Sequence, residues 1–431
     1  MPPTRAASSS SSPEPAAKRR KRSSPSASPL QDIADAGDRF GDEYGAKWAE
    51  WPAPRSQMTA ASEFIRDIVK HKRSVLLVPD KDADGLSAGT ILYQSLVHLG
   101  LPTDRIQVHH LSKGTNVHSQ KEAERIEAYN TDKIVVLDQG SRPGEPIAPA
   151  RDETPRVLII DHHQSAEWPD QSLVLTACNT PPIATAALLT YSLVRDLHPR
   201  IRPEEGWRAL VGVFGDLGPS EAKWGKAPWP AELGDMLKSV ADKSSVGSKN
   251  VSDAVAAVNA PRRTADYNVP RAWDIMLQAK GPKDIANHAY LKLCKIDVKD
   301  ETEKWARTAP KFSLDGRVAV VTIDSAFQIH PVIATRWAGN LGRKSKKLIM
   351  VMCANMGYNP DPAKVSFSCR IAASLRDLPD EERPNLIALL KEYGDMIPGF
   401  RERVGEDFAR GHKEATGGII QKVSSPFCFC L

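Results

Sequence analysis

Seven aspartate and histidine side chains in the first half of the sequence are the residues whose types and spacing could perform chemistry. They follow apolar segments at Asp80, Asp82, Asp84, Asp138, His162, His163 and Asp216. Carboxylates with one or two imidazoles suit Mn²⁺ or Mg²⁺ better than a structural zinc, which favours thiolates. The carboxylates are numerous enough for two ions, and a pair of ions can activate water for in-line displacement at phosphorus. The pattern therefore indicates metal-dependent phosphoryl chemistry.

Each of these motifs also has a simpler interpretation. The segment Asp80–Asp84 could be a solvated acidic turn in which Asp84 caps the next helix. Likewise, Asp161-His162-His163 could be a turn with surface histidines, and a single Asp after an apolar run is common in turns. Four carboxylate-terminated segments in order, one of them joined to a histidine pair, are harder to assign to chance.

The elements that must position these residues alternate between strand-like and helical patterns. Apolar runs at 74–79, 133–137 and 157–160 have the length and density of buried parallel strands, and 106–111 is a further strand-like run. Helical patterns are found at 58–69, 86–99, 119–129, 184–197 and 207–214. This alternation predicts an α/β fold with a mostly parallel sheet flanked by helices. The carboxyl ends of parallel strands share one edge, so we expect the acidic residues to converge there.

The rest of the chain divides by composition. Residues 221–310 are Lys-rich and interrupted by Pro, with helices expected near 231–242, 251–259, 271–279 and 283–295. A smaller α/β region follows, with strands at 318–323, 347–352 and 364–369 and helices at 331–341 and 384–393. The predicted domains are a disordered basic Ser/Pro-rich tail (1–57), an N-terminal α/β domain (58–220), a helical connector (221–310) and a C-terminal α/β domain (311–425).

The net charge of +5 over 431 residues belongs to the tail, because residues 1–30 hold six basic side chains against one acidic one. Five of the basic residues form the run Lys18–Arg22, which predicts a nuclear localisation signal read by an import receptor, an electrostatic arm or a solubilising cluster. Six scattered cysteines indicate a reducing compartment. No apolar window is long enough to span a membrane, and we expect no signal peptide. The segment Cys428–Leu431 formally resembles a prenylation box.

Four segments, in this order, resemble the four motifs of the DHH phosphoesterase superfamily: Asp80-Lys81-Asp82-Ala83-Asp84-Gly85, Leu137-Asp138-Gln139-Gly140, Asp161-His162-His163 and Gly215-Asp216. The first is more similar to the RecJ-type single-strand exonuclease branch than to the inorganic pyrophosphatase branch, which has His where Leu76 stands. Residues 365–418 also resemble the DHH-associated C-terminal domain. There Ser368-Cys369-Arg370 matches a Ser-x-Arg strand, and Gly411-His412 matches a glycine-rich His loop. That loop usually has two or three glycines before the His, whereas Ala409-Arg410 precedes Gly411 here.

The resemblance implies roles for individual residues. Metal ligands would be Asp80, Asp82, Asp138, His162 and Asp216, and Asp84 would be a further ligand or the cap of the following helix. His163 would contact the scissile phosphate, and Asp161 would orient the histidine pair. Substrate would be held across the cleft by Ser368, Arg370, Gly411 and His412. For Arg370 the alternative is a surface strand arginine, and for His412 a helix-capping histidine.

The expected function is a two-metal phosphodiesterase, using Mn²⁺ or Mg²⁺, that hydrolyses single-stranded nucleic-acid ends or short oligonucleotides. The alternatives are a phosphodiesterase or phosphatase for a small nucleotide, an exopolyphosphatase, and a non-catalytic replication scaffold, which would have lost ligands. Because the folded part is nearly neutral, backbone tracking would rely on local basic patches at 343–347 and 401–410. The sequence does not determine whether the substrate is DNA or RNA, the polarity of cleavage or the oligomeric state.

Overall fold

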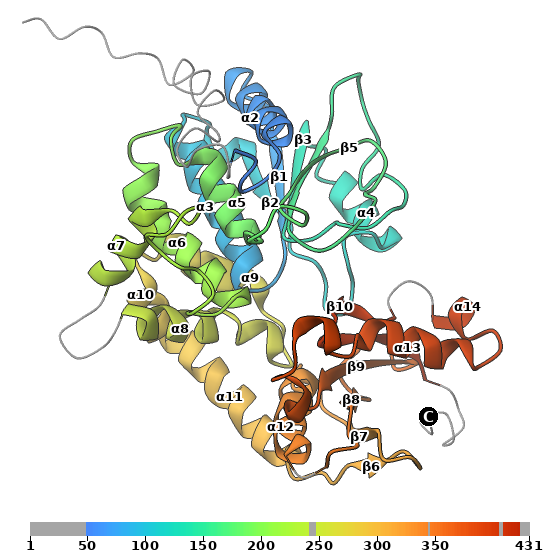
Figure 1. Ribbon diagram of the computed structural model, residues 1–431. Helices are drawn as coiled ribbons and strands as arrows, with labels where there is room; N and C mark the ends of the chain where they lie inside the picture. Colours follow the sequence, from blue (N-terminus) through green and yellow to red (C-terminus); the bar gives the residue numbers. More distant parts are fainter. Residues whose placement is uncertain (1–48, 241–246, 344, 405–407, 423–431) are drawn as a thin grey trace, which may run out of the picture.

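The computed structural model describes residues 49–240, 247–343, 345–404 and 408–422, which form two lobes joined by helices (Figure 1). In the N-terminal lobe the described strands form one five-stranded sheet of order β2-β1-β3-β4-β5, with every pair of neighbours parallel. These strands are β1 (Val75–Pro79), β2 (Ile106–Val108), β3 (Lys133–Leu137), β4 (Val157–Asp161) and β5 (Ser172–Thr176). The predicted α/β class with a mostly parallel sheet is confirmed.

Both faces of this sheet are covered by other parts of the chain. Side chains alternate between the two faces along each strand. Val75 and Leu77 face the larger core, whereas Leu76 and Val78 face a smaller one. The larger core is formed with α2 (Arg55–Lys70), α3 (Ala83–His98), α5 (Ala186–Val194) and α6 (Ile201–Asp216). The smaller core is covered by α4 (Gln120–Glu127) and the loop that precedes it. Burial on both faces explains why the strands read as continuous apolar runs.

A helical connector leads from α6 to the second lobe. Its elements are α7 (Ala231–Ser239), α8 (Gly247–Val258), the 3₁₀ turn η3 (Pro261–Arg263), α9 (Val269–Gln278), α10 (Pro282–Asn287) and α11 (Ala289–Trp305). The prediction of a single helix at 283–295 is wrong. The backbone at His288 is extended, with φ −63° and ψ 125°, and separates α10 from α11.

The C-terminal lobe is built on a mixed six-stranded sheet of order β10-β11-β9-β8-β7-β6. The strands are β6 (Lys311–Phe312), β7 (Val318–Ile323), β8 (Met350–Asn355), β9 (Lys364–Ile371), β10 (Arg410–His412) and β11 (Ala415–Gln421). The helices are α12 (His330–Gly342), α13 (Leu386–Asp395) and α14 (Phe400–Val404). Side chains of α12 and α13 belong to separate apolar clusters on the two faces of the sheet. The glycine-rich segment expected as a loop is instead the antiparallel β10–β11 hairpin.

Several predictions from the sequence fall on parts of the chain that the structure does not describe. Both Lys18–Arg22 and Cys428–Leu431 lie outside the described residues. Among the helices that are described, none combines the length and the apolar character needed to cross a bilayer.

Candidate active site

The predicted metal ligands converge at the carboxyl edge of the parallel sheet. Asp80 follows β1, Asp138 follows β3 and Asp216 is the last residue of α6. Potential ligand atoms within 4.8 Å of one another form three groups that include Asp138: Asp80, Asp82 and Asp138; Asp84, Asp138, His162 and Asp216; and Asp138, His162 and His163. The first two groups consist of predicted ligands. Two groups of oxygen and nitrogen donors that share one carboxylate suit a pair of hard divalent ions.

Asp138 is the centre of this cluster and is held in an unusual backbone conformation. Its φ is 62°, a region that Asp tolerates better than most residues. The side chain is buried, and its Oδ1 accepts no hydrogen bond from any described residue. Burial and the neighbouring carboxylates, Asp84 first among them, raise the pKa of the Asp138 carboxyl well above its usual range. A buried carboxylate without a donor is a group that a bound cation would neutralise.

The imidazole of His162 gives a second reason to place a cation here. Its Nε2 lies 2.9 Å from Asp216 Oδ2 and 3.3 Å from Asp138 Oδ1. One ring N–H cannot point at both oxygens, whereas a cation can be shared among all three groups. Burial acts to lower the pKa of His162, but the carboxylates around it, Asp216 first, outweigh burial and raise the pKa to about 9. The donor set therefore fits a divalent metal.

Asp161, the last residue of β4, organises the histidine pair. Its Oδ1 accepts from the backbone N–H groups of His162 and His163, at 2.8 and 3.3 Å, and lies 2.8 Å from Nδ1 of His163. Burial alone would raise the pKa of Asp161, but its hydrogen bonds, that from His163 first, lower it to about 2. The same contact outweighs the burial of His163 and raises the pKa of that imidazole to about 9. Asp161 thus fixes the ring of His163, whose side chain is 43% exposed at the cleft.

The first motif contains a correction to the sequence interpretation. Asp82, and not Asp84, is the N-cap of α3, because its carboxylate accepts from the N–H groups of Asp84 and Gly85. The fully buried Asp84 carboxylate instead accepts from the N–H groups of Ala186 and Ala187, at 2.7 and 3.0 Å. Asp84 thus ties the first motif to the start of α5, and its carboxylate also lies 3.9 Å from His162 Nε2. The prediction that Asp84 caps α3 is therefore wrong. Its role as a further metal ligand stays a prediction.

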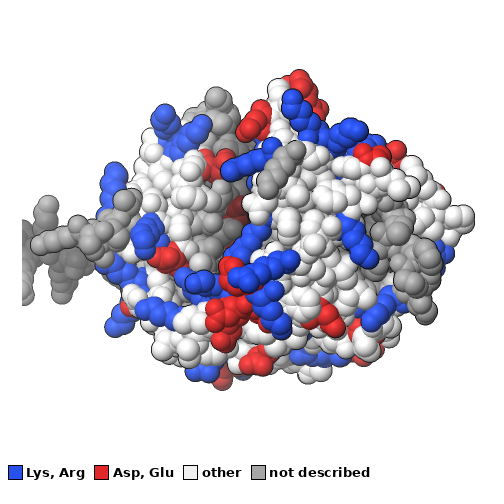
Figure 2. Space-filling model, turned by 90° about the horizontal axis from the view of Figure 1, so that it is seen from below, with Lys and Arg blue, Asp and Glu red and all other residues white. Residues whose placement is uncertain are grey.

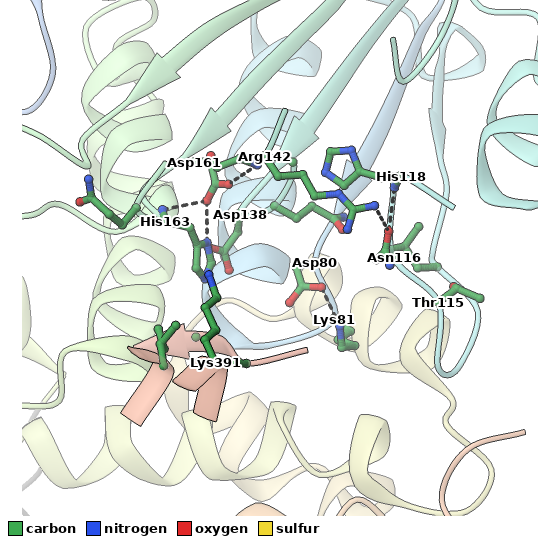
Figure 3. A pocket seen from close by; sticks show the side chains of 18 residues that line it. Asp80, Lys81, Thr115, Asn116, His118, Asp138, Arg142, Asp161, His163 and Lys391 are labelled. Atoms are coloured by element: carbon green, nitrogen blue, oxygen red, sulfur yellow. Dashed lines mark hydrogen bonds and ion pairs between the residues drawn. The ribbon is translucent and has the colours of Figure 1, made fainter. Parts of the chain in front are cut away.

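A cleft of about 540 Å³ separates the acidic cluster from the C-terminal lobe (Figure 3). On the N-terminal side it is lined by polar residues that include Asp80, Asp138, Arg142 and His163. From the opposite lobe come Lys391 of α13, Gly411 of β10 and two apolar residues. A second cavity, of about 420 Å³, shares Lys81, Thr115 and Asn116 with the first cleft and is lined by Ser368, Gly417, His330 and Tyr358. The substrate-facing region is therefore built by both lobes.

The predicted substrate-binding residues occupy different places in this region. Gly411 lines the first cleft and Ser368 the second. Arg370 is half-buried on β9, where its Nη1 donates to Ser368 Oγ at 2.7 Å and to the Cys369 carbonyl at 2.8 Å. The backbone of His412 lies in β10, and its side chain is outside the described set.

The sequence interpretation missed two arginines of the connector. In η3, Arg262 Nη2 lies 3.8 Å from Asp82 Oδ2, and Arg262 also donates to Asn259 and Gln328. Burial and the adjacent Arg262 lower the pKa of Arg263 to about 10, and Arg370 adds to the repulsion. The connector thus brings positive charge beside the first motif. Asn259 Oδ1, 176 positions along the chain, accepts from the Ala83 N–H, a contact that no local pattern could reveal.

Comparison with known proteins shows what the N-terminal lobe is similar to. Residues 74–210 match the family model described as "DHH family, N-terminal domain". This stretch, which contains Asp80, Asp138 and the histidine pair, is therefore a DHH-family N-terminal domain. The single-stranded-DNA-specific exonuclease RecJ of Thermus thermophilus is 25% identical over 226 residues, which are 51% of this chain and 33% of that protein. This similarity supports the RecJ-like branch over the pyrophosphatase branch, and the match spans only a third of the relative's length.

Solved structures of DHH proteins share the fold. The crystal structure of Thermus thermophilus RecJ in complex with Mn²⁺ has a TM-score of 0.55 at 18% identity, over 85% of this chain and 52% of that one. A DHH domain described as a member of the s1p family of ribosomal proteins has a TM-score of 0.59 at 13% identity, over 91% of this chain and 93% of that one. The two-lobed arrangement is thus one that other DHH proteins adopt.

Proposed function

We propose that this protein is a metal-dependent phosphodiesterase that hydrolyses single-stranded nucleic-acid ends or short oligonucleotides. The observation that carries the proposal is the pair of ligand groups that share Asp138, which lines, together with Asp80, a cleft that Lys391 also lines from the opposite lobe. One ion would be held by Asp80, Asp82 and Asp138, and the other by Asp138, His162 and Asp216. Divalent ions bound there would lower the pKa of water and stabilise charge on a phosphodiester. Solved structures of RecJ in complex with Mn²⁺ and with Mg²⁺ support either metal.

The chain's own residues would position the phosphodiester. His163 presents its imidazole toward the cleft, and its ring is fixed by Asp161. From the N-terminal lobe Lys81 and Arg142 line the cleft, and Lys391 extends toward it from α13 (Figure 3). On the connector side, the charge of Arg370 helps to lower the pKa of Arg263, so a bound anionic group would relieve the repulsion between the two guanidinium groups.

The size and charge of the surface favour a short substrate stretch. Each of the two cavities, which share three lining residues, has a volume in the range of a site for one small ligand. Together they can accept more than one nucleotide. On the face in Figure 2, lysine and arginine side chains are mixed with acidic ones and form no continuous basic stripe. Tracking of a long strand needs such a stripe, so binding of ends or short oligonucleotides is the better fit.

The same mixed surface is also compatible with a second candidate function, the hydrolysis of a small nucleotide or of polyphosphate. A digestion panel separates the two. Full-length protein is incubated with Mn²⁺, Mg²⁺ or EDTA and with labelled single-stranded DNA, single-stranded RNA, dinucleotides or inorganic polyphosphate. We expect metal-dependent release of nucleotides from the oligonucleotides. Hydrolysis confined to dinucleotides or polyphosphate would favour the second function, and no hydrolysis with any substrate and metal would refute both.

A further inference from the structure

The loop before α4 crosses from the N-terminal lobe to the rest of the molecule. The Lys113 ammonium donates to the Ala326 carbonyl at 2.7 Å in the C-terminal lobe, and to the Ala265 carbonyl at 3.2 Å in the connector. It also lies 4.7 Å from the centroid of the Tyr358 ring, which is within range of a cation–π contact. One side chain therefore touches both of the segments that the N-terminal lobe faces.

The residue after Lys113 brings the backbone itself close to the other lobe. Gly114 has φ +76°, and a Cβ placed there would lie 3.0 Å from Pro360 Cδ and 3.5 Å from Asn359 Nδ2. A larger residue would thus be strained at this position and would push against the Pro360 loop. The two lobes are therefore in close contact at the backbone of Gly114 as well as at the ammonium group of Lys113.

The loop is held in shape from inside the N-terminal lobe by the fully buried Glu122. Its carboxylate accepts from Ser112 N–H at 3.0 Å and from Thr115 Oγ1 at 2.7 Å. It also lies 2.8 Å from His109 Nε2 and 2.9 Å from Arg125 Nη1. Lys113 and Gly114 lie between Ser112 and Thr115, which Glu122 holds in place. The backbone from which Lys113 and Gly114 contact the other lobe is therefore fixed on both sides.

The same loop separates the two parts of the substrate region. Thr115 and Asn116 line both the cleft that contains Asp138 and the cavity that contains Ser368. In Figure 3, Asp80 and Lys81 lie between Asp138 on one side and these two loop residues on the other. A change in the distance between the lobes would alter how these two parts are aligned.

We propose that Lys113 is an interlobe latch that keeps the two cavities aligned for substrates long enough to occupy both. This inference rests on the proposed phosphodiesterase function and assigns Lys113 as a positioning residue. Substrates that reach only the acidic cluster do not require this alignment, whereas an oligonucleotide that enters both cavities does. Loss of the latch therefore lowers activity according to substrate length.

Steady-state kinetics on full-length variants tests the proposal. Lys113→Met keeps the aliphatic stem and removes the ammonium, and Lys121→Met changes an exposed lysine of α4 as the matched control. Each protein is assayed with Mn²⁺ on a single-stranded octanucleotide and on bis(p-nitrophenyl) phosphate. We expect Lys113→Met to lower kcat/KM on the octanucleotide by about 10- to 100-fold, because misplacement of this kind can cost about 10²-fold, and to leave the small ester within about twofold. Lys121→Met should match wild type on both, and Lys113→Arg should recover part of the loss.

Two kinetic outcomes would overturn the latch: wild-type rates on the octanucleotide, or an equal loss on both substrates. Wild-type protein inactive on both substrates would instead mean that the proposed function has failed. In that case amide hydrogen exchange decides the latch by itself. Faster exchange around residues 263–267 and 324–328 in Lys113→Met than in Lys121→Met would support an interlobe contact, and equal exchange would refute it.

Discussion

Asp138 stands where a carboxylate is unfavourable in the absence of a cation. It is buried, its Oδ1 has no donor among the described residues, and other carboxylates surround it. Positive φ at this position also costs conformational free energy. Residues kept under such strain are typical of functional sites, which is the physical argument for giving Asp138 the shared ligand position.

We expect Asp138→Asn to lower the Mn²⁺-dependent rate of hydrolysis by at least about 10²-fold, the loss typical of removing a charge-stabilising group. Asn tolerates positive φ, so the metal-free Tm should be unchanged or higher because carboxylate repulsion is relieved. Kinetics and thermal unfolding with and without Mn²⁺ provide the measurement. The exposed Asp170→Asn is the control. Activity within about tenfold of wild type would remove Asp138 from the metal site.

Glu122 gives a prediction for stability against pH. Burial alone would raise its pKa, but hydrogen bonds from Thr115, Ser112 and His109 outweigh it and lower the pKa from 4.5 to about 2. A carboxylate whose pKa is depressed by folding stabilises the protein above its unfolded pKa. That stabilisation is lost as the pH falls from about 4.5 toward 2.

The free energy of unfolding should therefore differ between wild type and Glu122→Gln by on the order of 3 kcal/mol at pH 7. The difference should shrink as the pH is lowered to 3. Urea unfolding at pH 7, 4 and 3 measures it. A difference that is the same at all three pH values would show that Glu122 acts through packing and not through its charge.

At the scale of elements, close contact among three helices holds the first motif in place. Gly212 of α6 packs where α3 and α5 approach. A Cβ there would lie 2.3 Å from Ala187 Cβ and 2.5 Å from Asp84 Oδ1. Because Asp84 Oδ1 accepts from the Ala187 N–H, any shift at Gly212 is transmitted to the strand-to-helix turn that carries Asp80 and Asp82.

We expect Gly212→Ala to destabilise the fold by about 1–3 kcal/mol, as overpacking of a core does, and to lower activity as well. Gly339→Ala is the matched control, because Gly339 is also in a helix and nothing lies within 4 Å of its added Cβ. This control should be neutral or up to about 1 kcal/mol more stable. Urea unfolding and Mn²⁺-dependent activity are measured on both variants. Equal stability of the two variants would show that the three helices can separate without cost.

The sequence predicted those strands whose burial produces a continuous run of apolar residues. Strands β1, β3 and β7 lie close to their expected ranges because their apolar runs are mostly buried. The edge strand β5 was missed because three of its residues are half-exposed and its apolar run is weak. The acidic residues could be grouped in advance because parallel strands share one carboxyl edge. Arg262 and Arg263 could not, since their approach to the first motif depends on tertiary packing alone.

At the scale of the whole molecule, the excess positive charge lies in a segment that contains none of the site residues. The run Lys18–Arg22 is outside the described residues, so its role stays a proposal. We expect a deletion of 18–22 to abolish nuclear enrichment of a tagged protein and to leave Mn²⁺-dependent hydrolysis unchanged. Deletion of the five serines at 8–12 is a control of equal length. Unchanged nuclear enrichment without 18–22 would refute the signal.

The two lobes divide the proposed work: every predicted metal ligand is in the N-terminal lobe, and the C-terminal lobe adds further residues that would bind substrate. Arg370 lies on β9 of the C-terminal lobe, beside Ser368 and close enough to Arg263 for mutual repulsion. Arg370→Ala should therefore weaken oligonucleotide binding by about 1–3 kcal/mol, which is about 5- to 150-fold in KM, as expected for a charged hydrogen bond. The metal content should not change, because none of the predicted ligands is in this lobe.

Metal analysis and kinetics on the same purified Arg370→Ala protein test this division of roles. Arg317→Ala is the matched control, since Arg317 is an exposed arginine of the same lobe. A wild-type KM would show that Arg370 serves only its own strand, through its bonds to Ser368 and Cys369. A loss of bound metal would instead show that the C-terminal lobe helps to hold the acidic cluster together.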